Sequence, residues 1–285
     1  MSNVHANGIH IEYETIGKTD AAPLLLIMGF GRQMIAWPDT LCSMLVERGF
    51  HVIRYDNRGV GLTTVGESGA ARDAAWPPYT LDDLADDSAG LLAALGIPAA
   101  HIVGASMGGA IAQSLAIRHP ERVLSLTSIM SSSGNPAVAG SDPDVVRLIS
   151  EPPTSERDEA VARAVRIALA IGSKGMVDEA RARDVAARSW DRNPSFAGLE
   201  GQRLAMAAST DRTEPLGHLS VPALVIHGEA DPLVSVRAGE ATAAAIPGAR
   251  LLTIPGMGHD LPEPVWTTVA DAIADVAGVA DALHR

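Results

Sequence analysis

The sequence contains almost no cysteine, which excludes a protein stabilised by internal disulfide bonds. Cys42 is the single cysteine among 285 residues, so an internal disulfide cannot form, and we expect a reducing, cytoplasmic location. Its neighbours Leu41, Met44 and Leu45 predict a packed helix face around the thiol rather than a setting that would stabilise a thiolate. We therefore expect no cysteine nucleophile.

Positive charge and long apolar runs are also scarce. The chain has 22 Lys and Arg against 34 Asp and Glu, a formal net charge of −12, which argues against nucleic acid and anionic membranes as partners. The longest uncharged apolar runs, such as 22–30, are too short to span a bilayer. Residues 1–13 have no basic stretch followed by an apolar one, so we expect no signal peptide. A small-molecule substrate and a monomer or homodimer are the expected partners.

Hydrophobic residues, by contrast, make up 47% of the chain, enough for one large α/β domain or two small ones. Strand and helix patterns alternate along 1–134 and 217–285, which we expect to form one α/β core. Repeated βα units predict a mostly parallel sheet with helices on both faces. Strands are expected at 9–16, 23–28, 50–55, 101–103, 122–130, 223–227 and 250–254, and helices at 37–48, 80–95, 107–119, 236–245 and 265–276.

Residues 135–216 differ from the rest of the chain. From 141 to about 214 the sequence has no strand pattern and is rich in Ala, Arg, Asp and Glu, with prolines between stretches of helical spacing. The segment interrupts the βα series and does not read as an independent domain. Because it leaves the core after one strand and returns before the next, we expect a helical cap, inserted after the sixth strand, over the carboxyl edge of the sheet.

The segment Gly104-Ala105-Ser106-Met107-Gly108-Gly109 follows an apolar strand pattern and precedes a helical one. G-x-S-x-G in this context predicts a serine at a sharp strand-to-helix turn, where its hydroxyl cannot be buried. The helix that follows directs free N–H groups and the positive end of its dipole at the same place. A glycine-rich turn with a passive serine is the plainer alternative, but the context favours Ser106 as a nucleophile.

A serine nucleophile needs a base, and the base needs an orienting acid. His259 lies in a glycine-flanked loop after one buried strand, and Asp231 lies in the loop after the preceding strand, where Pro232 favours an extended backbone. All three residues fall at the edge of the sheet where open α/β folds bind ligands. His227, on the strand itself, is expected to be a structural partner of neighbouring loops. The acids that remain as alternatives are Glu229, Asp260, Asp142 and Asp144.

An oxyanion hole needs two backbone donors, of which the Met107 amide is the first candidate. The loop 28–31, which follows an early strand, supplies the candidate for the second. Its glycines permit close backbone approach, so we expect the amides of Phe30 and Met107 to stabilise an oxyanion. An ordinary βα turn is the plainer alternative. We also expect an apolar pocket under the cap and a preference for small or medium apolar esters over charged or long-chain ones. Its predicted substrate-binding residues are Gly29, Met34, Ile35, Trp190, Phe196 and Met206.

We expect no metal and no cofactor. The acidic stretch Asp82, Asp83, Asp86 and Asp87 has helical spacing and is interpreted as a solvated face. Gly29-Phe30-Gly31 lacks the third glycine of a dinucleotide-binding turn.

Taken in order, these motifs resemble the α/β-hydrolase superfamily, over the whole chain apart from the inserted segment. Within it, the chain is most similar to the aclacinomycin methylesterase-like enzymes, through residues 27–29, 37–39, 52–56 and 254–259. It departs from the common pattern at Met28, where many members have histidine, and at Thr63, where many have serine.

The resemblance implies an α/β-hydrolase fold and a serine esterase that works through an acyl-enzyme. The superfamily also contains dehalogenases and epoxide hydrolases, which place aspartate at the turn, so Ser106 favours acyl transfer. Lactonase, thioesterase, C–C hydrolase, aminopeptidase and perhydrolase chemistry remain open. A binding protein that retains an unused triad is the alternative outside enzymes.

Overall fold

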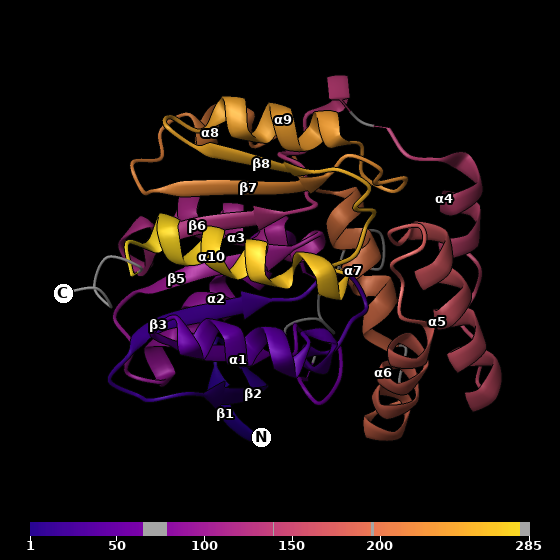
Figure 1. Cartoon of the computed structure of the whole chain (residues 1–285). Coiled ribbons are helices and arrows are strands. Elements are labelled where there is room, and N and C mark those ends of the chain that lie inside the picture. Colours follow the sequence, from indigo (N-terminus) through magenta and orange to yellow (C-terminus); the bar gives the residue numbers. More distant parts are fainter. Residues whose placement is uncertain (65–78, 139, 195–196, 280–285) are drawn as a thin grey trace.

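The computed structural model describes residues 1–64, 79–138, 140–194 and 197–279. Its centre is an eight-stranded sheet in the order β1-β2-β4-β3-β5-β6-β7-β8 (Figure 1). β1 and β2 are antiparallel to their neighbours, and all other pairs are parallel. The strands are β1 (Ser2–Ala6), β2 (Ile9–Ile16), β3 (Ala22–Ile27), β4 (Phe50–Tyr55), β5 (Ala100–Ala105), β6 (Val123–Ile129), β7 (Ala223–Gly228) and β8 (Arg250–Ile254).

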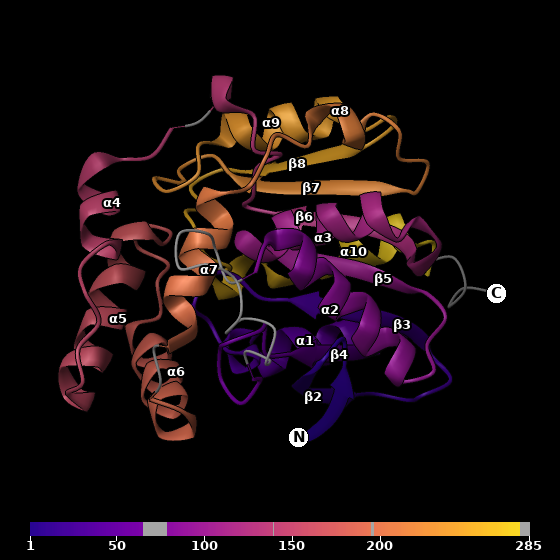
Figure 2. The same cartoon turned by 180° about the vertical axis from the view of Figure 1, so that it is seen from behind.

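Helices cover both faces of the sheet, as Figures 1 and 2 show from opposite sides. α1 (Asp39–Glu47) and α10 (Trp266–Ala277) pack on one face, and α2 (Leu81–Ala94) and α3 (Met107–Arg118) pack on the other. α9 (Val236–Ala245) contacts β7 and β8. The described chain also contains the 3-10 turns η1 (Met34–Ala36), η3 (Pro120–Arg122), η4 (Pro136–Val138) and η5 (Glu263–Val265). None of the described helices combines the length and apolarity that crossing a bilayer requires.

The strands predicted from continuous apolar runs are confirmed. β4, β5 and β7 are buried along their whole length, as expected for parallel strands with helices on both faces. The sequence pattern missed β1, which pairs with β2 at the edge of the sheet. Because β1 is mostly exposed and polar, its sequence lacks the apolar alternation that reveals a strand.

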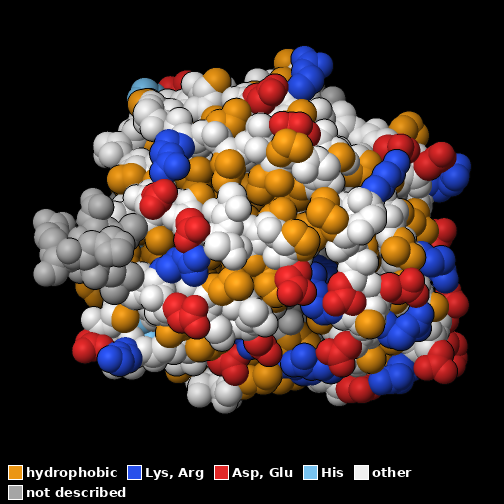
Figure 3. All heavy atoms as spheres, viewed as in Figure 1, with side chains coloured by type: hydrophobic (Ala, Val, Ile, Leu, Met, Phe, Trp, Pro, Cys, Tyr) orange, Lys and Arg blue, Asp and Glu red, His pale blue; other side chains and the backbone are white. Residues whose placement is uncertain are grey.

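The insertion, residues 135–216, lies between β6 and β7, and its described part contains no strand. In both views its helices α4, α5 and α6 stand beyond the carboxyl ends of the parallel strands, with α7 closer to the sheet (Figures 1 and 2). Acidic and basic side chains are dense over these outer helices (Figure 3). The insertion helices are α4 (Pro143–Ile149), α5 (Arg157–Ile171), α6 (Glu179–Arg192), α7 (Ala197–Ala207) and α8 (Thr213–Leu216).

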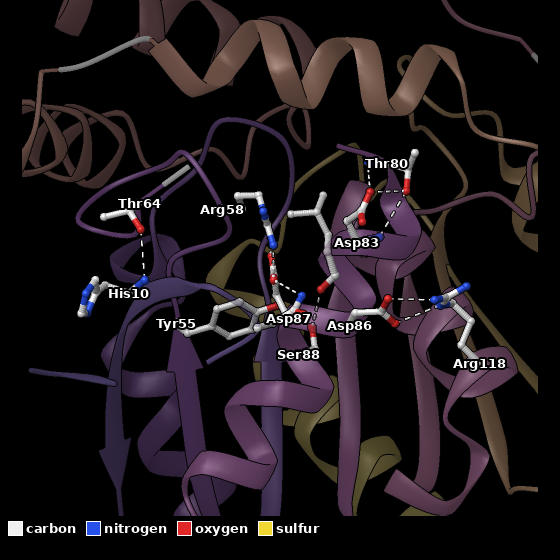
Figure 4. Close-up of polar contacts among 12 residues, drawn as sticks. His10, Tyr55, Arg58, Thr64, Thr80, Asp83, Asp86, Asp87, Ser88 and Arg118 are labelled. Carbon is white, nitrogen blue, oxygen red and sulfur yellow. Dashed lines mark hydrogen bonds and ion pairs between the residues drawn. The ribbon is translucent and has the colours of Figure 1, made fainter. Parts of the chain in front are cut away.

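The acidic stretch of α2 corrects one interpretation of the sequence, because it is not solvated throughout. Asp87 is fully buried; its carboxylate accepts hydrogen bonds from Arg58, at 2.5 and 2.8 Å, and from Asn7, at 2.7 Å. Asp86 does pair near the surface, with Arg118 at 2.8 Å (Figure 4). Burial raises the pKa of Asp87, and Arg58 opposes this effect. The buried pair fixes the turn after β4 against α2.

Candidate active site

Ser106 occupies the sharp turn between β5 and α3 in a strained backbone conformation. Its φ of 56° and ψ of −122° lie outside the regions that residues with a Cβ ordinarily adopt. Two hydrogen bonds hold this conformation: its amide donates to the Ile129 carbonyl at 2.8 Å, and its carbonyl accepts from the Gly109 amide at 2.9 Å. Strain at such a strand-to-helix turn leaves the hydroxyl presented at the apex of the turn.

The glycines that flank Ser106 are required by close backbone approach. A Cβ on Gly104 would lie 2.0 Å from the Gly108 carbonyl oxygen, and a Cβ on Gly108 would lie 2.1 Å from that of Ile27. Both distances are far below van der Waals contact, so larger residues would push α3 away from the sheet. The G-x-S-x-G pattern is therefore a packing requirement as well as a motif.

The structure brings Ser106, His259 and Asp231 together. His259 Nε2 lies 2.9 Å from Ser106 Oγ, and His259 Nδ1 lies 2.7 Å from Asp231 Oδ2. The second carboxylate oxygen, Oδ1, accepts hydrogen bonds from the amides of Leu233 and Val234, both at 2.8 Å. The imidazole is thus held between a hydroxyl and a carboxylate whose own orientation is fixed by the backbone.

Asp231 is strongly biased toward its ionised form. Burial by itself would raise its pKa, but hydrogen bonds with His227 and His259, the charge of His259 and the Val234 amide outweigh burial and lower the pKa to about 2. His227 Nε2 lies 2.8 Å from the Val234 carbonyl oxygen and 3.4 Å from Asp231 Oδ2. His227 therefore braces the loop that carries Asp231, as expected from its place on the strand.

The alternative acids have other partners. Glu229 accepts a hydrogen bond from the Thr253 hydroxyl at 3.0 Å, and Asp142 caps α4 at the surface. Asp144 pairs with Arg147 at 3.1 Å, with both side chains exposed. Of the acids considered, Asp231 is the one that hydrogen-bonds the His259 ring.

Two backbone amides beside Ser106 are free to donate. Neither the Phe30 amide nor the Met107 amide makes a hydrogen bond within the described part of the chain. Met107 is the first residue of α3, where helical amides have no partner within the helix. Gly29 packs directly against the serine, because a Cβ on Gly29 would lie 3.1 Å from Ser106 Cβ. Both amides therefore remain without a partner among the described residues and are available to donate to a bound group.

The insertion is hydrogen-bonded to the loop that carries His259, a feature that sequence reasoning missed. The His259 amide donates to the Ile171 carbonyl at 2.7 Å, and the Gly258 amide donates to Ser173 Oγ at 2.9 Å. Ser173 in turn donates to Asp260 Oδ1, from its hydroxyl at 2.5 Å and from its amide at 2.9 Å. Segments more than 80 residues apart in sequence therefore position the imidazole together.

The insertion also holds the loop that carries Phe30. The Gly31 amide donates to Gln202 Oε1 of α7 at 2.8 Å. Gln33 Nε2 donates to the Ser189 carbonyl of α6 at 2.8 Å, and Arg192 Nη1 donates to Gln33 Oε1 at 2.8 Å. Both loops beside Ser106 thus depend on insertion contacts for their position.

The predicted substrate-binding residues fall into different settings. Met34 has no solvent-accessible surface, so its side chain does not line an accessible pocket in this structure. Ile35 is also buried, Trp190 is half-buried on α6, and Met206 of α7 packs against the core. Phe196 lies outside the described residues.

Cys42 has the setting that its neighbours predict. Its side chain is buried, and burial raises the pKa of the thiol to about 11. A neutral thiol at physiological pH is a poor nucleophile. Within the described ranges, no group of three or more His, Cys, Asp and Glu side chains could hold a metal ion.

Comparison with known proteins places this geometry in a family. The model of the alpha/beta hydrolase fold matches residues 22–263. The chain is 31% identical to rhodomycin D methylesterase DauP of Streptomyces sp. (strain C5), over 91% of this chain and 92% of that protein. Rhodomycin D methylesterase DnrP of Streptomyces peucetius matches with the same identity and coverage.

Among solved structures, the enol-lactonase from Burkholderia xenovorans aligns with a TM-score of 0.68 and 25% identity, over 100% of both chains. The resemblance to the α/β-hydrolase superfamily is confirmed. It was expected from the turn at Ser106, the loops that carry Asp231 and His259, and the order of these motifs in the sequence. By fold and by sequence, the chain belongs to the α/β-hydrolase fold family.

Proposed function

We propose that this hydrolase cleaves carboxylic esters through an acyl-enzyme formed on Ser106, with His259 as general base and Asp231 as the acid that orients it. The observation that carries the proposal is the continuous chain of contacts from Ser106 Oγ to His259 Nε2, at 2.9 Å, and from His259 Nδ1 to Asp231 Oδ2, at 2.7 Å. A hydroxyl, an imidazole and a buried carboxylate in this sequence are the parts that acyl transfer requires.

In the first half of the reaction, His259 takes the hydroxyl proton while Ser106 Oγ bonds to the ester carbonyl carbon. The carbonyl electron pair moves onto oxygen, where the free amides of Phe30 and Met107 would donate to it. The tetrahedral species then collapses, the carbon–alkoxy bond breaks, and the alcohol leaves with the proton from His259.

In the second half, water replaces the alcohol. His259 removes a proton from water as the oxygen attacks the acyl carbon, and the bond to Ser106 Oγ breaks when the second tetrahedral species collapses. Ser106 recovers its proton and the carboxylic acid is released. Throughout, Asp231, with a pKa of about 2, stays ionised and stabilises the imidazolium that forms on His259.

The proposed substrates are small or medium esters with a largely apolar body. Relatives named as rhodomycin D methylesterases favour methanol, or another small alcohol, as the leaving group. Gly29 leaves little space next to Ser106, since even a Cβ there would approach to 3.1 Å. We assign the selection of the acyl group to the insertion, because it contacts both loops that flank the serine.

The decisive test removes the proposed nucleophile. Ser106→Ala should lower kcat for p-nitrophenyl acetate by on the order of 10³ or more, because the three groups act as a unit. Wild type should also gain the mass of one acyl group when rapidly quenched, and the variant should not.

The control is Ser155→Ala. Ser155 lies in the insertion, and its side chain has no hydrogen-bond partner among the described residues. This variant should match wild type in turnover and in acylation. Near-normal turnover by Ser106→Ala would refute the proposed mechanism.

A further inference from the structure

The loop that carries Phe30 is hydrogen-bonded to other segments of the chain at three points along its backbone. These points are the Met28 carbonyl, the Gly31 amide and the Met34 amide. Phe30 lies between the first two, and its own amide makes no hydrogen bond within the described part of the chain. The position of this amide is therefore set by the anchors on either side of it.

Two of the anchors are side chains of the turn that directly follows β4. Asn57 Nδ2 donates to the Met28 carbonyl at 2.7 Å, and Asp56 Oδ1 accepts from the Met34 amide at 2.8 Å. Asp56 has no solvent-accessible surface, and Asn57 is 1% exposed. Because an unpaired polar group is costly in such a setting, both ends of the loop follow the position of this turn.

The third anchor connects the middle of the loop with the same turn through the insertion. Gln202 of α7 is fully buried. Its Oε1 accepts from the Gly31 amide at 2.8 Å, and its Nε2 donates at 3.2 Å to the carbonyl of Arg58, the residue after Asn57. Residues 56–58 are therefore connected with all three anchors of the loop.

The turn that receives the anchors is itself held by buried ion pairs. Arg58 pairs with Asp87 of α2 at 2.5 Å (Figure 4). Asp56 Oδ2 accepts from the Leu62 amide at 2.9 Å and from Nη1 of Arg192, the last residue of α6, at 2.6 Å. Since desolvation offsets much of the attraction in a buried ion pair, such pairs add little net stability. Their consequence here is a turn that is fixed to both the core and the insertion.

Asn57 carries a cost that the stability of the fold does not explain. Its Oδ1 is buried and has no hydrogen-bond partner among the residues that the structure describes. An unsatisfied buried acceptor is destabilising, and an apolar side chain of similar shape would avoid that cost. Such a side chain could not donate to the Met28 carbonyl. The asparagine is therefore accounted for by the position of the loop.

We propose that the turn 56–58 sets the position of the Phe30 amide in the oxyanion hole, with Asn57 and Gln202 as positioning residues. The inference rests on the proposed acyl transfer at Ser106 and adds two residues that act through the Phe30 amide. A donor must lie about 3 Å from the oxyanion, and a misplacement of about 1 Å can cost on the order of 100-fold in rate. Loss of either anchor should therefore weaken stabilisation of the transition state more than binding of the ester.

The test replaces each anchor with leucine, which has a similar volume and no hydrogen-bonding group. In Asn57→Leu and in Gln202→Leu, kcat for p-nitrophenyl acetate should fall about tenfold to a hundredfold, with KM within about threefold of wild type. Gln113→Leu is the matched control. Gln113 is also fully buried and its amide makes two hydrogen bonds, to Ser128 and from Arg212, so its loss should change the unfolding midpoint and leave kcat near the wild-type value.

Inhibition by phenylboronic acid separates positioning from stability. Boron bonds to Ser106 Oγ as His259 takes the hydroxyl proton, and the resulting tetrahedral anion carries two B–OH oxygens that stand in for the oxyanion. The inhibition constant should rise about tenfold in both anchor variants, because transition-state analogues depend on the same donors. It should stay at the wild-type value in Gln113→Leu. Since an inhibition constant does not depend on how much of the enzyme is folded, a purely structural role would not change it.

The two variants remove different anchors, so either one tests the proposal if the other does not fold. A wild-type kcat and inhibition constant in the folded variants, or the same rise in Gln113→Leu, would overturn the positioning role while ester hydrolysis stands. Failure of both variants to fold would assign the two residues to stability and overturn it as well. If wild type itself does not hydrolyse p-nitrophenyl acetate, the proposed function is rejected, and the inference with it.

Discussion

At the scale of single residues, the site depends on side chains whose environment fixes their state before substrate arrives. Ser106 is held at φ 56° by backbone hydrogen bonds, and Asp231 is buried but receives two amide N–H groups. Preorganisation of this kind is effective because no reorientation is needed as charge develops. Two predictions concern Asp231, which has a role in the proposed mechanism and a pKa lowered to about 2 in the folded protein.

Asp231→Asn should lower kcat by on the order of 10³ or more with the fold intact, because a neutral amide cannot hold His259 in the required tautomer. Asp142→Asn, at an exposed helix cap, is the control and should leave kcat unchanged. If Asp142→Asn proved to be the damaging change, the acid would be misassigned. The acid limb of the wild-type pH profile should not come from Asp231, whose pKa is about 2.

The same residue predicts a pH dependence of stability. The folded-state pKa of Asp231 is depressed from 3.8 to about 2, so its ionised form favours folding by about 2 kcal/mol above the unfolded pKa. That contribution is lost as the pH falls through the folded pKa. Denaturant titrations of wild type and Asp231→Asn should therefore differ most above about pH 4 and converge toward pH 2. A difference that grew as the pH fell would contradict this assignment.

At the scale of elements, the segment after α5 and the loop after β8 form one hydrogen-bonded unit. Ile171 and Ser173 accept hydrogen bonds from the amides of His259 and Gly258, so the insertion helps to set the height and direction of the imidazole. We expect Ser173 to be a positioning residue, since its hydroxyl contacts the loop rather than the reacting atoms.

Ser173→Ala should lower kcat about tenfold with little change in KM, because one net hydrogen bond is worth on the order of 1 kcal/mol and its loss frees the loop. The measurement is steady-state kinetics at several pH values alongside the unfolding midpoint. Asp260→Asn is the matched variant, because an amide oxygen can still accept from both donors of Ser173, and it should retain more activity. Equal changes in kcat and KM, or none, would leave Ser173 as a purely structural residue.

These contacts also explain which parts of the fold and of the candidate site could be predicted from the sequence. Buried strands such as β5 and β7 are readable because two covered faces require continuous apolar runs, and Ser106 is readable because its turn requires glycines. The contact of Ser173 with Gly258 could not be predicted from the sequence, since it depends on how the insertion packs against the loop that carries His259. The burial of Asp87 was missed because helical spacing groups acids on one face without showing what covers them.

At the scale of the whole molecule, the core supplies Ser106, His259 and Asp231, and the insertion contacts both loops around them. α6 and α7 reach the loop that carries Phe30 through Gln33 and Gly31, while the outer surface of the insertion carries exposed ion pairs such as Arg157 with Asp191. Exposed pairs of this kind contribute little to stability. Because α6 and α7 contact the loop beside Ser106, we expect the side of the insertion that faces the core to influence substrate choice.

Trp190→Ala and Met206→Ala should change the ranking of methyl, ethyl, butyl and hexyl esters by roughly threefold or more, because each removes half-buried apolar surface from α6 or α7, the helices that contact the loop at Gly31 and Gln33. Their unfolding midpoints should fall by only a few degrees, as expected for losses of about 1 kcal/mol in a chain of this size. Val146→Ala, at a residue 40% exposed on α4, is the control and should keep the wild-type ranking. Identical ester profiles in all four folded proteins would remove these two residues from substrate selection and leave the insertion with a structural role alone.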